Sequence, residues 1–221
     1  MLAEPDEVHL WAIDLDPPPS EAARRVAATT DGERERAARF WRREDGDRYL
    51  SAHGALRLVL AECLACDPLA MCFAEGEHGK PFLDGAPVEF NLSHSSDLAL
   101  IAVARSRRVG VDVERVRSVA DLDDLAGRVC TPAELATLAT LAETHRARAF
   151  LSMWTRKEAL AKATGDGIGG VMRDAHATDA DARSWTVVEV DDLPGYVACV
   201  VGEGSGWRVV RRTMAALTER R

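Results

Sequence analysis

Apolar and polar positions along the chain predict helices followed by strands, and this order occurs twice. Residues 8–15 have the length of a strand, and the proline-rich stretch 16–20 ends it in a turn. Ser20 is expected to cap a helix over residues 21–28. Further helices are expected over 34–41 and 45–64, the latter with leucines near helical spacing. Short strands are expected at 71–73 and 81–83, followed by a polar loop at 90–96 and a strand over 97–104.

The second half repeats this order. A strand is expected over 109–116, a helix starts at Thr131, and 147–164 has a strong helical pattern. Strands are expected at 185–190, 195–201 and 207–212. The sequence therefore predicts an α+β fold with two similar lobes, residues 1–108 and 109–221, and a hinge near 105–112.

Composition narrows the class of protein. The 221 residues suffice for a core that needs no disulfide or metal. With 28 basic and 36 acidic side chains the net charge is −8, which argues against a nucleic-acid partner. The longest apolar run, 98–104, is too short for a membrane helix, and residues 1–6 lack the basic start of a signal peptide. Five cysteines form no extracellular disulfide framework. We expect a cytoplasmic protein with reduced thiols.

Two acidic residues stand at alternate positions of the strand expected over 109–116. There Asp112 and Glu114 share one face, opposite Val109, Val111 and Val113. Two neighbouring carboxylates repel each other unless a cation lies between them, and oxygen ligands suit Mg²⁺. The alternative is a solvated strand face near a turn.

Three further candidates have simple structural explanations. Glu158 and Lys162 lie one helical turn apart, as an exposed salt bridge would, with Trp154 in the core. His94 in the polar loop can be a structural hydrogen-bonding residue. Ser93 beside it is no hydrolase nucleophile, because no G-x-S-x-G sequence exists.

Two other motifs are rejected as functional sites. Residues 165–170 fit G-x-G-x-x-G, but a helix precedes them where a dinucleotide site needs a strand, so a helix end and loop are expected. Cys63, Cys66, Cys72 and His78 have a spacing that can suggest zinc. No second close pair follows, and the first two cysteines can simply be buried on one helix face.

The order of four motifs is more specific than any one of them. They are GKP at 79–81, NLSHS at 91–95, GVDVE at 110–114 and WTRKEALAK at 154–162. Together they resemble the 4′-phosphopantetheinyl transferases, in particular the two-lobed class that activates nonribosomal peptide and polyketide synthases. The resemblance covers 79–162 and reaches more weakly to Arg36.

The resemblance implies a pseudo-dimer of two similar α+β lobes with coenzyme A bound between them. The first lobe would bind the coenzyme, and the second would carry the metal site and the catalytic helix. The implied reaction moves the phosphopantetheine arm to a serine of an apo acyl or peptidyl carrier protein and releases adenosine 3′,5′-bisphosphate. We expect a monomer with coenzyme A and carrier proteins as partners, and with neither nucleic acid nor membrane.

The resemblance also implies roles for residues of the second lobe. Asp112, Glu114 and Glu158 would hold Mg²⁺, and Glu158 would accept the serine proton, with His94 as the alternative base. Lys162 would meet the leaving bisphosphate. Glu134 resembles an acid near the family's metal site, but it also completes a capping box with Thr131, and both roles stay open.

For the coenzyme, the resemblance implies contacts to its phosphates from Lys80 and His94, with Ser93 beside them. Arg36 would hold the 3′-phosphate. Four more arginines lie beside it and are further candidates: Arg34, Arg39, Arg42 and Arg43.

Two other functions compete with the transferase. One is a carrier-binding pseudoenzyme that keeps the fold without turnover. The other is a different Mg²⁺-dependent phosphoryl-transfer enzyme that acts on nucleotides. The sequence does not name the natural carrier.

Overall fold

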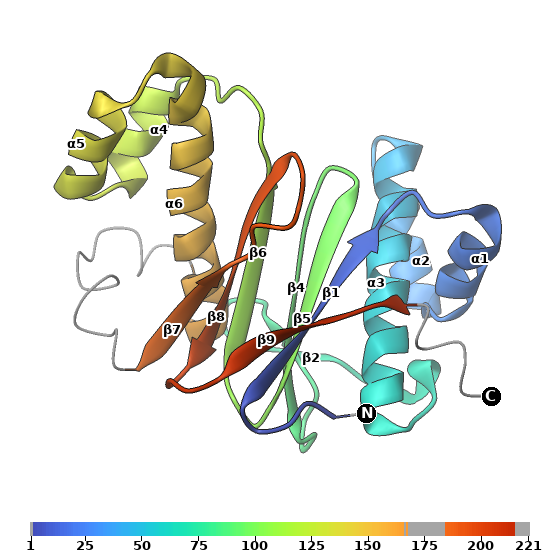
Figure 1. Ribbon diagram of the computed structural model, residues 1–221. Coiled ribbons are helices and arrows are strands. Elements are labelled where there is room, and N and C mark those ends of the chain that lie inside the picture. The colour runs from blue at the N-terminus through green and yellow to red at the C-terminus, as the bar shows by residue number, and fades with distance from the viewer. Residues whose placement is uncertain (1, 166, 168–183, 215–221) are drawn as a thin grey trace.

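The computed structural model describes residues 2–165, 167 and 184–214, and it is a mixed α+β fold as expected (Figure 1). The first half contains β1 (Glu7–Asp14), α1 (Pro19–Ala27), α2 (Asp31–Ala37), α3 (Arg43–Leu64), η1 (Pro68–Ala70), β2 (Ala74–Glu75), β3 (Pro81–Phe82), β4 (Val88–Ser95) and β5 (Leu98–Arg105). The second half contains β6 (Val109–Arg115), α4 (Leu122–Val129), α5 (Pro132–Thr140), α6 (Glu143–Thr164), β7 (Trp185–Glu189), β8 (Tyr196–Glu203) and β9 (Arg208–Arg212). No described helix is long and apolar enough to cross a membrane.

The strands form two main sheets and a small hairpin. The first sheet has the order β4-β5-β1-β9, the second has β6-β8-β7, and β2 pairs with β3. All pairs are antiparallel except β1 with β9, which is parallel. The last strand therefore returns to the sheet of the first half and lies beside β1 (Figure 1). A division of the chain at residue 108 stays a prediction, and residues 208–212 join the sheet built by the first half.

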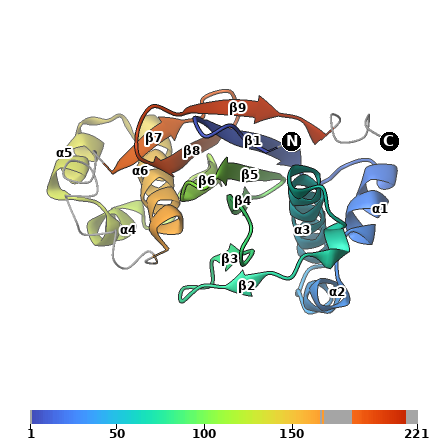
Figure 2. The same ribbon diagram turned by 90° about the horizontal axis from the view of Figure 1, so that it is seen from below.

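Each lobe contains one long helix that packs on its sheet, and this is the feature that the two lobes share. Both α3 and α6 have 22 residues. Helix α3 packs on the first sheet through a core that includes Leu56, Leu60 and Ile101, and α6 packs on the second through Ala159 and Val201. The two helices lie on opposite outer faces of the pair of sheets and enclose the sheets between them (Figure 2). A third core, with Leu10 and Leu100 of the first sheet against valines of β6 and β8, joins the lobes.

Helices α4 and α5 are tied to α6 by one buried lysine. The Lys157 ammonium donates to Val129 O at 2.7 Å and to Glu134 Oε2 at 2.7 Å. The same carboxylate oxygen accepts from Thr131 N at 2.7 Å and so completes the capping box of α5. Glu134 therefore caps a helix and neutralises Lys157, which confirms its expected capping role.

Several expected elements differ from the structure. The stretch 90–96, expected to be a loop, lies largely within β4. Its polar residues alternate with Phe90 and Leu92. Because their side chains form hydrogen bonds with β6, this segment can form a strand with one polar face. Helix α1 begins at Pro19 without a side-chain cap from Ser20, since proline suits the first helical position.

Three other boundaries were misplaced or missed. Helix α2 begins earlier than expected, because Thr30 and Glu33 form a capping box. Helix α4 was not expected at all. The short strand expected at 71–73 instead occupies Ala74–Glu75, where it pairs with β3.

Gly110 lets α6 approach β6 at backbone distance. A Cβ at this position would lie 2.0 Å from Ala159 O and 2.6 Å from Ala163 N. Both neighbours are helix backbone, which cannot turn aside as a flexible side chain can. Since Asp112 follows two residues later on the same strand face, this contact sets the distance between Asp112 and the functional side of α6.

We expect Gly110→Ala to destabilise the protein by at least ~1–3 kcal/mol, because the added methyl group forces strand and helix apart. Thermal unfolding compares it with Gly127→Ala. Gly127 lies in α4, and a Cβ added there would meet nothing within 4 Å, so that substitution should be neutral or slightly stabilising. Equal melting temperatures for the two variants would contradict the close packing of β6 on α6.

Candidate active site

Side chains of β4 bind the open edge of β6 and join the two sheets. Asn91 Oδ1 accepts a hydrogen bond from Val111 N at 2.9 Å, and Ser95 Oγ accepts one from Arg115 N at 3.2 Å. Ser93 Oγ, between them, donates to Asp112 Oδ1 at 2.7 Å. We call Asn91, Ser93 and Ser95 the seam. Because the three residues alternate along the strand, they share one face of β4, and together they bring β4 and β6 into contact.

Asp112 is the buried centre of the site. Its side chain is 6% exposed, and its Oδ1 accepts from Ser93 and, at 2.6 Å, from the Lys162 ammonium. Lys162 also donates to Ser93 Oγ at 3.0 Å. The other oxygen, Oδ2, is buried and lacks a hydrogen-bond partner within the described residues. Buried carboxylate oxygens normally have partners, so Oδ2 is available to a further cation.

Glu114 and Glu158 add negative charge around Asp112. Glu114 Oε2 accepts from Ser95 Oγ at 2.8 Å. Burial raises the pKa of Glu158 above its ordinary value; Lys162 opposes this shift, while the charges of Asp112 and Glu114 add to it. The environment of Glu158, including its two acidic neighbours, therefore favours the protonated carboxyl group.

A cleft of about 330 Å³ opens beside these groups. Its lining comes from the β2–β3 turn, β4 and the end of α6, and includes Lys80, Asn91, Glu158 and Lys162. Lys80 donates to Val109 O at 3.0 Å, and burial lowers its pKa. Both lysines thus have partners from β6.

The remaining predicted residues lie farther toward α3. His94 is solvent-exposed at the end of β4, and partial desolvation by the surrounding protein lowers its pKa, with the positive charges of His53 and Lys162 adding to this effect. Arg36 is exposed on α2, with its guanidinium 5.5 Å from the centre of the Tyr49 ring. The structure therefore brings Ser93, Asp112 and Lys162 into direct contact, whereas Arg36 contacts α3 instead.

The site offers donors for a hard cation, but it is not closed around one. Among residues 2–165, 167 and 184–214, no three His, Cys, Asp or Glu side chains are arranged as a ready metal site. The acidic donor set and the unpartnered Asp112 Oδ2 nevertheless fit Mg²⁺. Lys162 currently supplies the only positive charge that bonds Asp112 in the described part of the chain.

The simpler explanations of these motifs are resolved by the geometry. Asp112 is buried, so it is not part of a solvated strand face. Lys162 of α6 pairs with Asp112 of β6 within the second lobe, not with Glu158 in an exposed bridge. Cys63 is buried on α3 as expected, but the expectation for Cys66 is wrong, because α3 ends at Leu64 and Cys66 beyond it is exposed, as is Cys72. Gly165 ends α6 in the left-handed conformation, as expected, and Gly169 and Gly170 lie outside the described residues.

Sequence reasoning missed the partners that hold the site together. Asn91 and Ser95 belong to the NLSHS motif, and the alternation of polar and apolar residues over 90–95 is a signal that indicates a strand. Lys157 precedes Glu158 on α6, yet it points to α5. No sequence signal distinguishes these two neighbours, because helix orientation decides which one faces the cleft.

Known proteins resemble the chain along nearly its whole length. Residues 14–106 match the family model "4′-phosphopantetheinyl transferase, N-terminal", and residues 108–209 match the 4′-phosphopantetheinyl transferase superfamily. The 4′-phosphopantetheinyl transferase HetI of Nostoc sp. is 37% identical over 214 residues, which is 92% of this chain and 90% of HetI.

Two proteins of Bacillus subtilis extend this likeness. A 4′-phosphopantetheinyl transferase is 30% identical over 162 residues, which is 72% of this chain and 71% of the relative. The transferase Sfp of strain 168 is 27% identical with the same coverage. With its two matched regions, its two-lobed fold and its acidic site between the lobes, the chain belongs to the 4′-phosphopantetheinyl transferase superfamily.

Proposed function

We propose that this protein transfers the 4′-phosphopantetheine arm of coenzyme A to a serine of an apo acyl or peptidyl carrier protein. The products are the holo-carrier and adenosine 3′,5′-bisphosphate. The observation that carries the proposal is the cluster of Ser93, Asp112 and Lys162, which joins both lobes beside the cleft and leaves one buried carboxylate oxygen without a partner in the described part of the chain. The relatives that match most of the chain are named 4′-phosphopantetheinyl transferases, and these names support the same reaction.

The reaction needs positioned charge more than it needs covalent catalysis. The serine hydroxyl attacks the β-phosphorus of the coenzyme's pyrophosphate, and the bond to the leaving bisphosphate breaks. Lys162 would meet negative charge on the leaving group, and Lys80 and His94 would contact phosphate oxygens. Glu158 would accept the serine proton, since its carboxyl group lines the cleft and its raised pKa makes it a stronger base than an ordinary carboxylate.

Asp112, Glu114 and Glu158 would hold Mg²⁺ in this proposal. The ion would neutralise pyrophosphate oxygens during transfer. Without it, three acidic side chains face a polyanionic substrate with Lys162 as their neighbouring cation. The carriers would belong to fatty-acid, polyketide or peptide synthases. A cytoplasmic location and a monomeric state stay predictions from the sequence.

Mass spectrometry of an apo carrier protein incubated with coenzyme A, Mg²⁺ and this protein tests the reaction. A gain of one phosphopantetheine arm on the carrier serine supports the transferase. Carrier binding without a mass gain, across a panel of carriers, would favour the pseudoenzyme. Thermal stabilisation by ATP but not by coenzyme A would favour another phosphoryl-transfer enzyme.

Asp112→Asn tests the acidic centre. The substitution keeps the shape and an acceptor for Ser93 but removes the charge, so we expect a loss of transfer of at least about 10²-fold with a small change in melting temperature. Asp124→Asn, an exposed change on α4, is the matched control and should keep full activity. Near-normal turnover of Asp112→Asn at saturating Mg²⁺ would remove Asp112 from the site.

Glu158→Gln tests the proton acceptor. A base acts only when deprotonated, so transfer by the unsubstituted protein should fall as pH drops through the Glu158 pKa. Burial raises this pKa in the metal-free protein, and Mg²⁺ held by the same carboxylate would lower it, so the acidic limb of the pH–rate profile should move to lower pH as the Mg²⁺ concentration rises. Glu158→Gln should lower the rate roughly 10²–10⁴-fold and flatten the limb.

Lys162→Ala is the control for this profile. It keeps the carboxylate that accepts the proton, so it should retain an acidic limb despite a lower rate. The pH–rate profile of Glu158→Gln, measured at saturating Mg²⁺ and coenzyme A, can also keep the acidic limb of the unsubstituted protein. In that case Glu158 is a ligand only, and the base is another group such as His94.

A further inference from the structure

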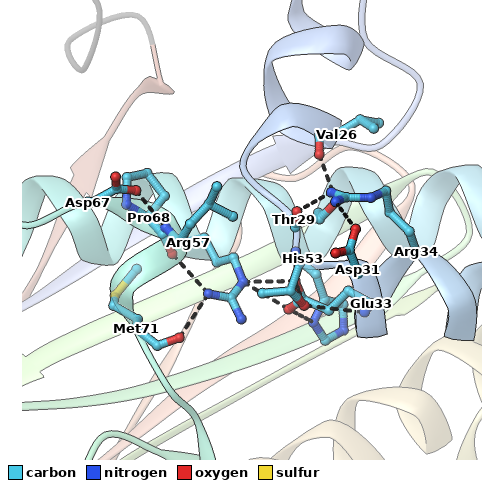
Figure 3. Close-up of polar contacts among 12 residues, drawn as sticks. Val26, Thr29, Asp31, Glu33, Arg34, His53, Arg57, Asp67, Pro68 and Met71 are labelled. Carbon is cyan, nitrogen blue, oxygen red and sulfur yellow. Dashed lines mark hydrogen bonds and ion pairs between the residues drawn. The ribbon is translucent and has the colours of Figure 1, made fainter.

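A stripe of three side chains on α3 faces α2, outside the cluster around Asp112. Tyr49, His53 and Arg57 are spaced four residues apart and therefore share one face of the helix. Figure 3 shows His53 and Arg57 on either side of Glu33 from α2. None of these contacts takes part in the chemistry proposed above.

Arg57 is fully engaged within the protein. Its Nε donates to both oxygens of Glu33, at 2.8 and 3.0 Å, and its Nη1 donates to Pro68 O and Met71 O. Its guanidinium lies 4.8 Å from the centre of the Phe73 ring. The side chain is 5% exposed, so Arg57 stabilises Glu33 and is unavailable to a ligand.

Glu33 is a charged anchor for His53. Burial alone would raise its pKa, but hydrogen bonds from His53, Thr30 N and Arg57 lower it to about 2. His53 Nδ1 lies 3.8 Å from Glu33 Oε1, and the ring stacks on Tyr49 with centroids 4.0 Å apart. Glu33 thus contacts the edge of the imidazole ring at Nδ1, and Tyr49 packs against its face.

The other ring nitrogen of His53 is left for a ligand. Nε2 makes no hydrogen bond within the described residues, and the side chain is 27% exposed. The Tyr49 ring that stacks on His53 also lies under the Arg36 guanidinium. Arg36 of α2 and His53 of α3 therefore both contact the Tyr49 ring.

We propose that His53, with Nδ1–H directed at Glu33 and a second proton on Nε2, is an additional donor to the 3′-phosphate of coenzyme A, beside Arg36, with Glu33 as the positioning residue that holds the ring. The inference rests on the proposed function. A phosphate carries several acceptor oxygens, so donors that reach it from α2 and α3 can act together. An imidazole fixed by a carboxylate and a stacked ring loses little side-chain entropy on binding.

Isothermal titration of the protein with coenzyme A and with 3′-dephospho-coenzyme A tests this role without a carrier. His53→Asn keeps a polar group near Glu33 but removes the Nε2 donor. We expect it to weaken coenzyme A binding by about tenfold or more, as for a lost hydrogen bond to a charged group. Binding of 3′-dephospho-coenzyme A should stay unchanged. His53→Gln reaches farther and should restore part of the preference for the 3′-phosphate.

His145→Asn, on α6, is the matched control and should bind both ligands as the unsubstituted protein does. Equal weakening of both ligands by His53→Asn would make His53 a structural residue only. An unchanged preference in that variant, or no preference in the unsubstituted protein, would overturn the inference and leave the proposed function intact. Failure of the unsubstituted protein to bind coenzyme A would overturn both.

Discussion

The contact between β4 and β6 is the interaction on which the site depends. Each strand is an edge of its own sheet, and such edges carry backbone groups without partners. Asn91 and Ser95 accept hydrogen bonds from the edge amides of Val111 and Arg115, so side chains, and not another strand, pair with this edge of the second sheet. Ser93, between them, reaches Asp112. The seam therefore closes an edge and positions an acidic residue at the same time.

The two halves contribute different parts of the site across this seam. The first half supplies the hydroxyl group of Ser93 from β4, and the second supplies carboxylates from β6 and both Glu158 and Lys162 from α6. Gly110 removes the side chain that would separate β6 from α6, so Asp112 and Lys162 meet at 2.6 Å. Behind them, Lys157 fixes α6 to the cap of α5. Neighbouring residues of one helix thus have separate structural and chemical roles.

Periodicity predicted the long helices and the valine face of β6 because these depend on local pattern and burial. It placed residues 90–96 in a loop, since the partners of a polar strand face come from another part of the chain. The motifs identified Asp112, Glu158 and Lys162 as candidates. Their geometry, however, arises from pairings such as Lys162 with Asp112, fifty residues apart. His53 and Lys157 had no sequence signal, because only tertiary packing gives them partners.

Native-state hydrogen exchange at the Val111 amide is the most direct test of the seam. If Asn91 holds this edge, the amide should exchange slowly, at a rate comparable with amides of the central strand β8, such as Val200. Asn91→Leu should speed exchange at Val111 far more than at Val200, because it removes the acceptor at one edge only. Fast exchange of Val111 in the unsubstituted protein, or equal acceleration at both amides in the variant, would contradict a site assembled by side chains across the seam.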